Sequence, residues 1–221
     1  MGAAIGQILG FAVGVAISPV PIIALILMLF SNKATANSLS FTAGWLLGLF
    51  GAGLVVLALG LEASSGEPSD TSGYVKMAIG VLFLFLGWKK WKERPRGDEE
   101  PQMPGWMASI EDFSAVKALG VGLLLSAANP KNLGLTIAAA ATIGASGLDA
   151  SEEFIVLVVF VLLASMTILV PVGIYLIMGS KATPVLTSMK EWLIANNNTV
   201  MMVLFAVLGA KLLGDGISIV W

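Results

Sequence analysis

The residues best suited to chemistry form a short polar run inside an apolar stretch, Asn129-Pro130-Lys131-Asn132. A lysine at membrane depth costs roughly 2.5–3.5 kcal/mol on insertion scales, so such a side chain usually faces a cavity or a partner. The asparagine amides can bind either a ligand or freed backbone groups. Lys131 beside the start of a new half-helix therefore predicts a site for an anionic group, carboxylate or phosphate. In the alternative, Lys131 snorkels to the membrane surface and Asn129 merely caps a helix.

A second proline-containing run, Ser18-Pro19-Val20-Pro21, interrupts the first apolar stretch and carries no charge. Hydrocarbon holds no water, so a helix can break there only where protein or a wet cavity satisfies the freed backbone groups. Two interrupted segments in corresponding positions of two halves are typical of transporters built from repeats. We therefore expect the first break to shape a cavity opposite Lys131. The candidate substrate-binding residues are Ser18, Pro19, Pro21, Asn129, Pro130, Lys131 and Asn132.

Composition places the chain in the membrane. Of its 221 residues, 57% are hydrophobic and 12% are charged, and its mean hydropathy is +0.92. Soluble domains are about 25% charged. The chain has no cysteine or histidine, which argues against disulfides, thiol chemistry and zinc sites. No acidic residue falls deep inside a predicted span, and the sequence has no glycine-rich phosphate loop, catalytic triad or metal-spaced cluster. We therefore expect no metal, no cofactor and no enzymatic activity, and the net charge of −2 predicts no nucleic-acid partner.

The apolar stretches predict an all-α integral membrane protein with six transmembrane helices, the first and fourth broken at proline. A span needs about 20 apolar residues. The predicted helices cover residues 5–30, 39–61, 74–92, 115–145, 154–178 and 199–220. They form a first three-helix repeat (1–93), a cytoplasmic linker (94–112) and a second, inverted repeat (113–221). Within the polar stretch Glu93–Asp112, Trp106, Met107 and Ile110 form either a short interfacial helix or part of a solvated linker.

Internal similarity and charge support the inverted repeat. Residues 81–89 and 203–211, which close the third and sixth helices, agree at six of nine positions. Lys/Arg bias sets topology, and it places both termini outside the cytoplasm. The predicted cytoplasmic loops hold Lys33, Lys89, Lys90, Lys92, Arg94, Arg96, Lys117, Lys181 and Lys190, against Lys76 and Lys211 on the other side. No Lys or Arg precedes Lys33, so we expect the first helix to be retained rather than cleaved as a signal peptide.

Small and aromatic residues predict packing and anchoring. Small residues four positions apart let helices approach closely. Such spacing occurs at Gly6, Gly10, Gly14 and Ser18, at Gly44 and Gly48, and at Ala118, Gly122 and Ser126. Tryptophans are typical of membrane interfaces, which predicts anchors at Trp45, Trp88, Trp91, Trp192 and Trp221. Lys211 and Asp215 are spaced to form an i,i+4 ion pair.

The two break motifs, the six predicted spans and the chain length resemble the LysE superfamily of exporters. Within it, the run from Gly14 to Ser31, GVAISPVPIIALILMLFS, resembles the GAP (peptidoglycolipid addressing protein) family of actinobacteria, which includes the sulfolipid-addressing proteins. The resemblance implies export of amino acids, ions or cell-envelope glycolipids. It maps the break motifs of the family onto Pro19, Pro21, Asn129, Pro130 and Lys131. The thiol-relay activity of one branch does not carry over, because this chain lacks the cysteine pair.

These observations predict a transporter in the inner (plasma) membrane that exports a cell-envelope lipid or glycolipid with an anionic or polar head group by alternating access. Its expected partners are the bilayer and the substrate, with a homo-oligomer or envelope-synthesis proteins as further possibilities. Two alternatives stay open. The protein is an exporter of small solutes such as amino acids, or it is a scaffold that assembles envelope-synthesis enzymes without transporting anything.

Overall fold

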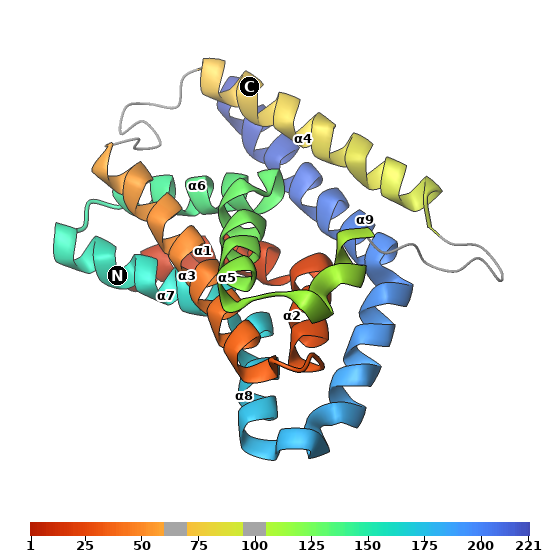
Figure 1. Ribbon diagram of the computed structural model, residues 1–221. Helices are drawn as coiled ribbons and strands as arrows, with labels where there is room; N and C mark the ends of the chain where they lie inside the picture. Colours follow the sequence, from red (N-terminus) through yellow and green to blue (C-terminus); the bar gives the residue numbers. More distant parts are fainter. Residues whose placement is uncertain (60–69, 95–104) are drawn as a thin grey trace. The chain divides into compact units, whose positions relative to one another are not determined.

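The computed structural model describes residues 1–59, 70–94 and 105–221, and all regular elements in these ranges are helical, as predicted (Figure 1). The α-helices are α1 (Gly2–Ala16), α2 (Pro19–Leu29), α3 (Ala34–Ala58), α4 (Asp70–Lys92), α5 (Ala115–Leu123), α6 (Pro130–Gly144), α7 (Ala150–Ala164), α8 (Met166–Met178) and α9 (Thr183–Val220). Three shorter elements are η1 (Gly105–Asp112), the π-helical turn η2 (Leu124–Ala128) and η3 (Gly179–Ala182).

Several helices are long and apolar enough to cross a bilayer, so the chain is a membrane protein. Among the described residues these are α3 and the helical stretch Met166–Val220, joined by a third span if α1 and α2, which are bent by 57° at their break, count as one. The helices α5, α6 and α7 have 9, 15 and 15 residues, fewer than the ~20 that a straight span needs. Six spans therefore stay a prediction that depends on joining these pieces.

Two of the predicted helices differ most from the structure. The last helix begins at Thr183 rather than at residue 199, because Pro184 is tolerated in a first turn and Leu186 is fully buried. Asn196, Asn197 and Asn198 remain helical, since helix propensity is a weak preference that packing overrides. The predicted helix 154–178 is also divided in two, at Ser165.

The contacts divide the chain into two compact units, one made of Met1–Ala63 with Met103–Trp192 and the other of Ser64–Gln102 with Leu193–Trp221. The predicted division into repeats concerns symmetry rather than contacts, and it stays a prediction. Residues 95–104 of the predicted linker, with Arg96, lie outside the described residues. The rest of that stretch contains the short helix η1, in which Met107 and Ile110 are buried and which contacts α2. Its location at the membrane interface stays a prediction.

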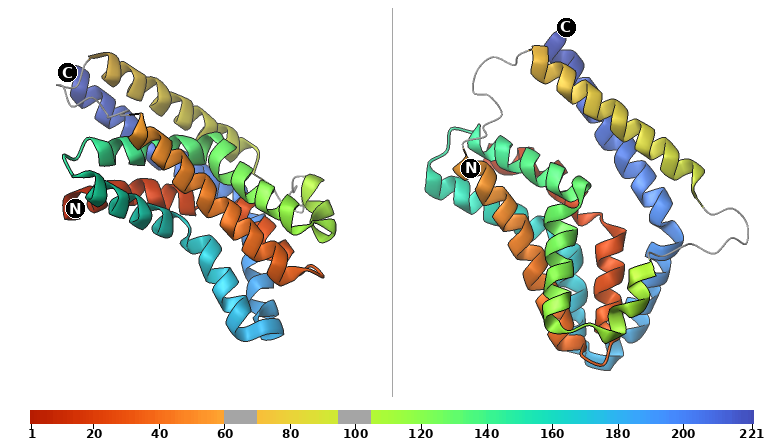
Figure 2. Two further views of the ribbon diagram at one scale, coloured as in Figure 1. Left: turned by 60° about the vertical axis from the view of Figure 1, so that its left-hand side comes forward. Right: turned by 45° about the horizontal axis from the view of Figure 1, so that its top comes forward.

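In the first unit, α3 lies alongside α5, and small residues bring their backbones together (Figure 2). A Cβ atom on Gly44 would collide with the carbonyl oxygen of Leu119, and one on Gly122 would collide with that of Phe41. The packing role predicted for these glycines is confirmed. It is wrong for Gly6 and Gly10, which are exposed and would have no atom within 4 Å of an added Cβ. There α1 packs with the opposite face instead.

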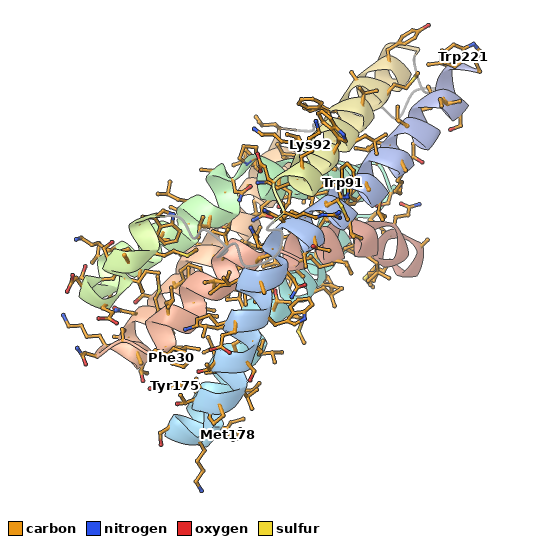
Figure 3. All side chains as sticks on the ribbon, turned by 90° about the vertical axis from the view of Figure 1, so that its right-hand side faces the viewer. Phe30, Trp91, Lys92, Tyr175, Met178 and Trp221 are labelled. Carbon is orange, nitrogen blue, oxygen red and sulfur yellow. The ribbon has the colours of Figure 1, made fainter. Side chains whose placement is uncertain are left out.

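In the second unit, α4 lies alongside the later part of α9 (Figure 1). A Cβ atom on Gly80 would lie 2.9 Å from the carbonyl oxygen of Gly209, and a Cβ on Gly209 would lie 2.9 Å from that of Gly80. The predicted ion pair on α9 is confirmed, with 2.6 Å between Lys211 Nζ and Asp215 Oδ2. Figure 3 labels Trp91 and Lys92 near the end of α4.

Candidate functional site

The two helix breaks meet in the first unit. The first helix stops at Ala16, and α2 begins at Pro19. The second break separates η2 from α6, which begins at Pro130. Proline suits the first turn of a helix because its missing N–H would have no partner there. The sequence therefore places both breaks correctly.

Lys131 joins the two breaks through all three donors of its ammonium group. Its Nζ donates to the carbonyl oxygen of Gly14 at 2.9 Å, to that of Ile17 at 2.8 Å and to Ser18 Oγ at 2.6 Å. The residue is only 7% exposed. The alternative in which Lys131 snorkels to the membrane surface is therefore wrong.

The prolines of the first break leave two carbonyls without helical donors, and Lys131 serves one of them. In a continuous helix the amide of residue i+4 donates to the carbonyl of residue i. Pro19 and Pro21 lack that N–H, which leaves the carbonyl oxygens of Val15 and Ile17 without a helical donor. Ser18 Oγ lies 2.7 Å from the first oxygen, and Lys131 Nζ serves the second. Pro19 and Pro21 thus create acceptors rather than offering groups of their own.

The other two carbonyls at the end of α1 are also satisfied. The amide of Ser18 donates to Ala16 at 2.9 Å instead of to Gly14, so the Gly14 oxygen is free for Lys131. The Ala16 oxygen accepts a second bond, of 2.7 Å, from Thr167 Oγ1 of α8. Buried backbone groups are almost always paired, and this broken end follows that rule with side chains from α6 and α8.

Asn129 and Asn132 complete the second break. Asn129 Oδ1 accepts from the backbone N–H of Lys131 at 3.1 Å, so Asn129 is the N-cap of α6, as the alternative interpretation expects. Asn132 Nδ2 donates to the carbonyl of Leu125 at 2.9 Å, while its Oδ1 lies 3.1 Å from Ser18 Oγ. Asn132 is fully buried and bridges the two breaks.

The groups that accept hydrogen bonds from Lys131 Nζ are polar but uncharged. No carboxylate forms an ion pair with it among the described residues. The ammonium instead lies at the C-terminal end of α1, where the helix dipole is negative. This differs from the sequence expectation of an open anion site at the start of α6, facing the first break across a cavity. In this conformation the breaks are in direct hydrogen-bond contact, and protein oxygens hold every ammonium donor.

Two partners on the fifth predicted helix were not predicted from the sequence. Thr167 caps α1, and Ser165 Oγ accepts from Trp45 Nε1 at 3.1 Å at the break between α7 and α8. Trp45 is fully buried, so its predicted role as an interfacial anchor is wrong. Trp88 and Trp91, by contrast, are exposed. The hydroxyl groups of Ser165 and Thr167 inside an apolar stretch were the feature that could have indicated these contacts, because a hydroxyl away from water needs a hydrogen-bond partner.

Nothing in the described part of the chain groups three or more His, Cys, Asp or Glu side chains where they could hold a metal ion. The chemistry available at the breaks is therefore that of an ammonium, two amides and hydroxyls. Such groups bind and release oxygen atoms of a ligand by exchanging hydrogen bonds.

A comparison with protein families identifies the chain. A family model described as Sap, sulfolipid-1-addressing protein, matches residues 8–218. The chain therefore belongs to this family, which agrees with the predicted resemblance to lipid-addressing proteins. Membership of the LysE superfamily stays a prediction. No curated protein and no solved structure matched the chain.

Proposed function

We propose that this protein exports a cell-envelope lipid or glycolipid with an anionic head group across the plasma membrane by alternating access. The observation that carries the proposal is the bonding of Lys131, a buried cation that holds two broken helices together through neutral oxygens alone. Ionisable groups inside membranes are costly and mark substrate pathways. The family description names a sulfolipid, which is an anionic amphiphile, and this chemistry suits an ammonium.

In the proposed mechanism, Lys131 exchanges its backbone carbonyl acceptors for oxygen atoms of the substrate head group. An anionic head group that reaches the breaks offers Lys131 stronger acceptors than the carbonyls of Gly14 and Ile17, because charge-assisted hydrogen bonds are about twice as strong as neutral ones. When the ammonium leaves these carbonyls, α1 loses its hydrogen bonds to Lys131 of α6. Substrate binding thereby favours a conformation in which the two halves are free to move apart. Asn132 holds the head group from the α6 side.

The proposed architecture is six spans in an inverted three-plus-three repeat with both termini outside the cytoplasm, as in the LysE superfamily. Helix packing supports it. The second predicted span packs on the fourth, through α3 and α5, and the fifth packs on the first, through α7 with α1 and α8 with α2. An inverted repeat superposes the first span on the fourth and the second on the fifth. It therefore relates the contact between the second and fourth spans to a contact between the fifth and first spans, and both contacts are present.

The packing of α4 on α9 supports the repeat independently. The sequence alignment of residues 81–89 with 203–211 also pairs Gly80 with Met202 and Gly87 with Gly209. In the structure Gly80 packs on Gly209, and Gly87 packs on Met202. Replacing both residues of the first contact by their aligned counterparts therefore gives the second contact, as a two-fold axis between α4 and α9 requires.

The test compares envelope lipids and excreted metabolites in cells with and without the protein. We expect loss of the protein to keep an anionic envelope lipid on the inner side of the membrane, and we expect wild type and Lys33→Gln to restore export. Lys131→Met, present at the same level, should not restore it. A change confined to small excreted solutes would favour the small-solute exporter, and reduced synthesis of the lipid would favour the scaffold. Full rescue by Lys131→Met would refute the role of Lys131.

A further inference from the structure

A cavity of about 470 Å³ lies in the first unit, where α2 ends. Its apolar lining includes Leu27 and Phe30 from α2, with Met107 and Ile110 from η1. Met107 and Ile110 are 4% and 1% exposed, so η1 is firmly packed and the wall they form is fixed. The volume is within the range of about 300–1,000 Å³ typical of sites for small ligands. Figure 3 labels Phe30.

Two charged side chains of opposite sign also line this cavity, which we call the α2–η1 cavity. Lys190 Nζ lies 5.6 Å from the centre of the Phe30 ring, and Glu111 comes from the last turn of η1. Neither side chain forms an ion pair in the part of the chain that the structure describes. The cavity thus presents a cation that can take an anion and a carboxylate that can accept hydrogen bonds from a donor.

The lining defines the chemistry of an occupant. The apolar side chains would hold the beginning of a hydrocarbon chain, because burying that surface is favourable. Lys190 favours an anionic group, and Glu111 favours a hydroxyl or another donor. A simple anion would be repelled by Glu111, and a molecule without charge would leave Lys190 unused. An amphiphile whose head group carries both an anion and hydroxyl groups can interact favourably with the apolar side chains, Lys190 and Glu111 at once.

We propose that the α2–η1 cavity is a loading site for a bilayer amphiphile whose anionic head group also carries hydroxyls, with Lys190 on the anion and Glu111 accepting from a hydroxyl. This inference rests on the proposed export function, because it describes where the substrate binds before it reaches the helix breaks. Phe30 and Lys33 lie on either side of the turn that follows α2, and Lys33 belongs to the predicted cytoplasmic side. The cavity therefore faces the side from which an exported lipid must be taken.

The experiment uses the full-length protein in vesicles that contain a trace of photoactivatable phosphatidylglycerol, whose head group has a phosphate and two hydroxyls. Cross-linked peptides are identified by mass spectrometry. We expect labelling of the segments around Phe30 and Met107. Lys190→Gln should lower this labelling about tenfold, as loss of a charge-assisted bond does. Glu111→Gln should lower it by a smaller factor, and Ala108→Trp, which fills the cavity, should abolish it.

Lys181→Gln is the matched control, because Lys181 is an exposed lysine that does not line the cavity. It should label like wild type, and a phosphatidylcholine probe, which has no hydroxyl, should label weakly. Equal labelling of wild type, Lys190→Gln and Ala108→Trp, each confirmed as folded, would overturn the proposal. Export that depends on Lys131 without cavity labelling refutes the loading site alone. Specific labelling without export supports the cavity and refutes the proposed function.

Discussion

Replacement of Lys131 by methionine separates the function of its ammonium group from its contribution to stability. Methionine keeps an unbranched apolar side chain of similar length and removes the charge. The change leaves the carbonyl oxygens of Gly14 and Ile17 without their donor, at about 1–3 kcal/mol each. It also removes a charge from the membrane, which returns roughly 2.5–3.5 kcal/mol. The net effect therefore lies between about 1.5 kcal/mol of stabilisation and 3.5 kcal/mol of destabilisation.

Binding should change far more than folding. If the ammonium binds the anionic head group, Lys131→Met forfeits a charge-assisted bond of about 1.5–3 kcal/mol, which weakens binding about 10- to 150-fold. All proteins compared carry Ala108→Trp, which fills the α2–η1 cavity, so that phosphatidylglycerol cannot bind there. Each purified protein is titrated in a neutral detergent with short-chain phosphatidylglycerol while its unfolding temperature is recorded, since a ligand that binds the folded state stabilises it by RT ln(1 + [L]/Kd). We expect the concentration needed for a given shift to rise by that factor.

Two variants complete the test. Lys131→Arg keeps a cation at the break and should retain part of the binding. Ser18→Ala removes one acceptor of the ammonium in this structure but leaves the cation intact, so it should bind the amphiphile at least as well as wild type. The reasoning is refuted if Lys131→Met is folded within the calculated range and is stabilised by the amphiphile at wild-type concentrations. A failure of Lys131→Met to fold at all would refute the energetic estimate.

Three further predictions concern stability, measured by unfolding of the purified protein in detergent. Gly44→Ala should cost about 1–3 kcal/mol, because its Cβ would collide with a carbonyl oxygen of α5. Gly51→Ala, on the same helix with no atom within 4 Å, should instead stabilise by up to about 1 kcal/mol, and equal effects would contradict the packing. Trp45→Phe should destabilise, and a double-mutant cycle with Ser165→Ala should give about 0.5–1.5 kcal/mol of coupling; a coupling of zero would exclude the hydrogen bond. Hydrogen bonds, first from the Ser151 hydroxyl, hold the pKa of Asp149 below its ordinary value, so its cap on α7 should stabilise at neutral pH and be lost as pH falls through that lowered pKa, a loss that Asp149→Ala should abolish.

The sequence was most informative about where the helices break. Proline removes a backbone donor whatever the surroundings, so Pro19 and Pro130 mark the ends of half-helices without any tertiary information. The choice of Lys131 as the central residue followed from the cost of a charge in an apolar stretch. The helical class and the close contact at Gly44 were likewise predictable from local composition and spacing.

The sequence alone could not identify hydrogen-bond partners that lie far apart in the chain. Nothing local shows that Lys131 points toward α1 rather than toward the start of its own helix, because the orientation depends on how α1 packs on α6. The partners of Trp45 and Thr167 lie 120 and 151 residues away in the chain. Gly6 and Gly10 have the spacing of a packing stripe, yet another face of α1 is buried. Spacing shows which residues share a face, while the neighbours decide which face is covered.

The most direct measurement of the central claim is the movement of a fluorescent anionic amphiphile between the leaflets of vesicles that contain only this protein and lipid. The probe is placed in one leaflet, and a quencher that cannot cross the bilayer reports its arrival in the other. Wild-type protein should move the probe many times faster than protein-free vesicles, while Lys131→Met, inserted to the same amount, should fall to the protein-free rate. Equal rates for wild type and Lys131→Met, or no acceleration by wild type, would contradict the account.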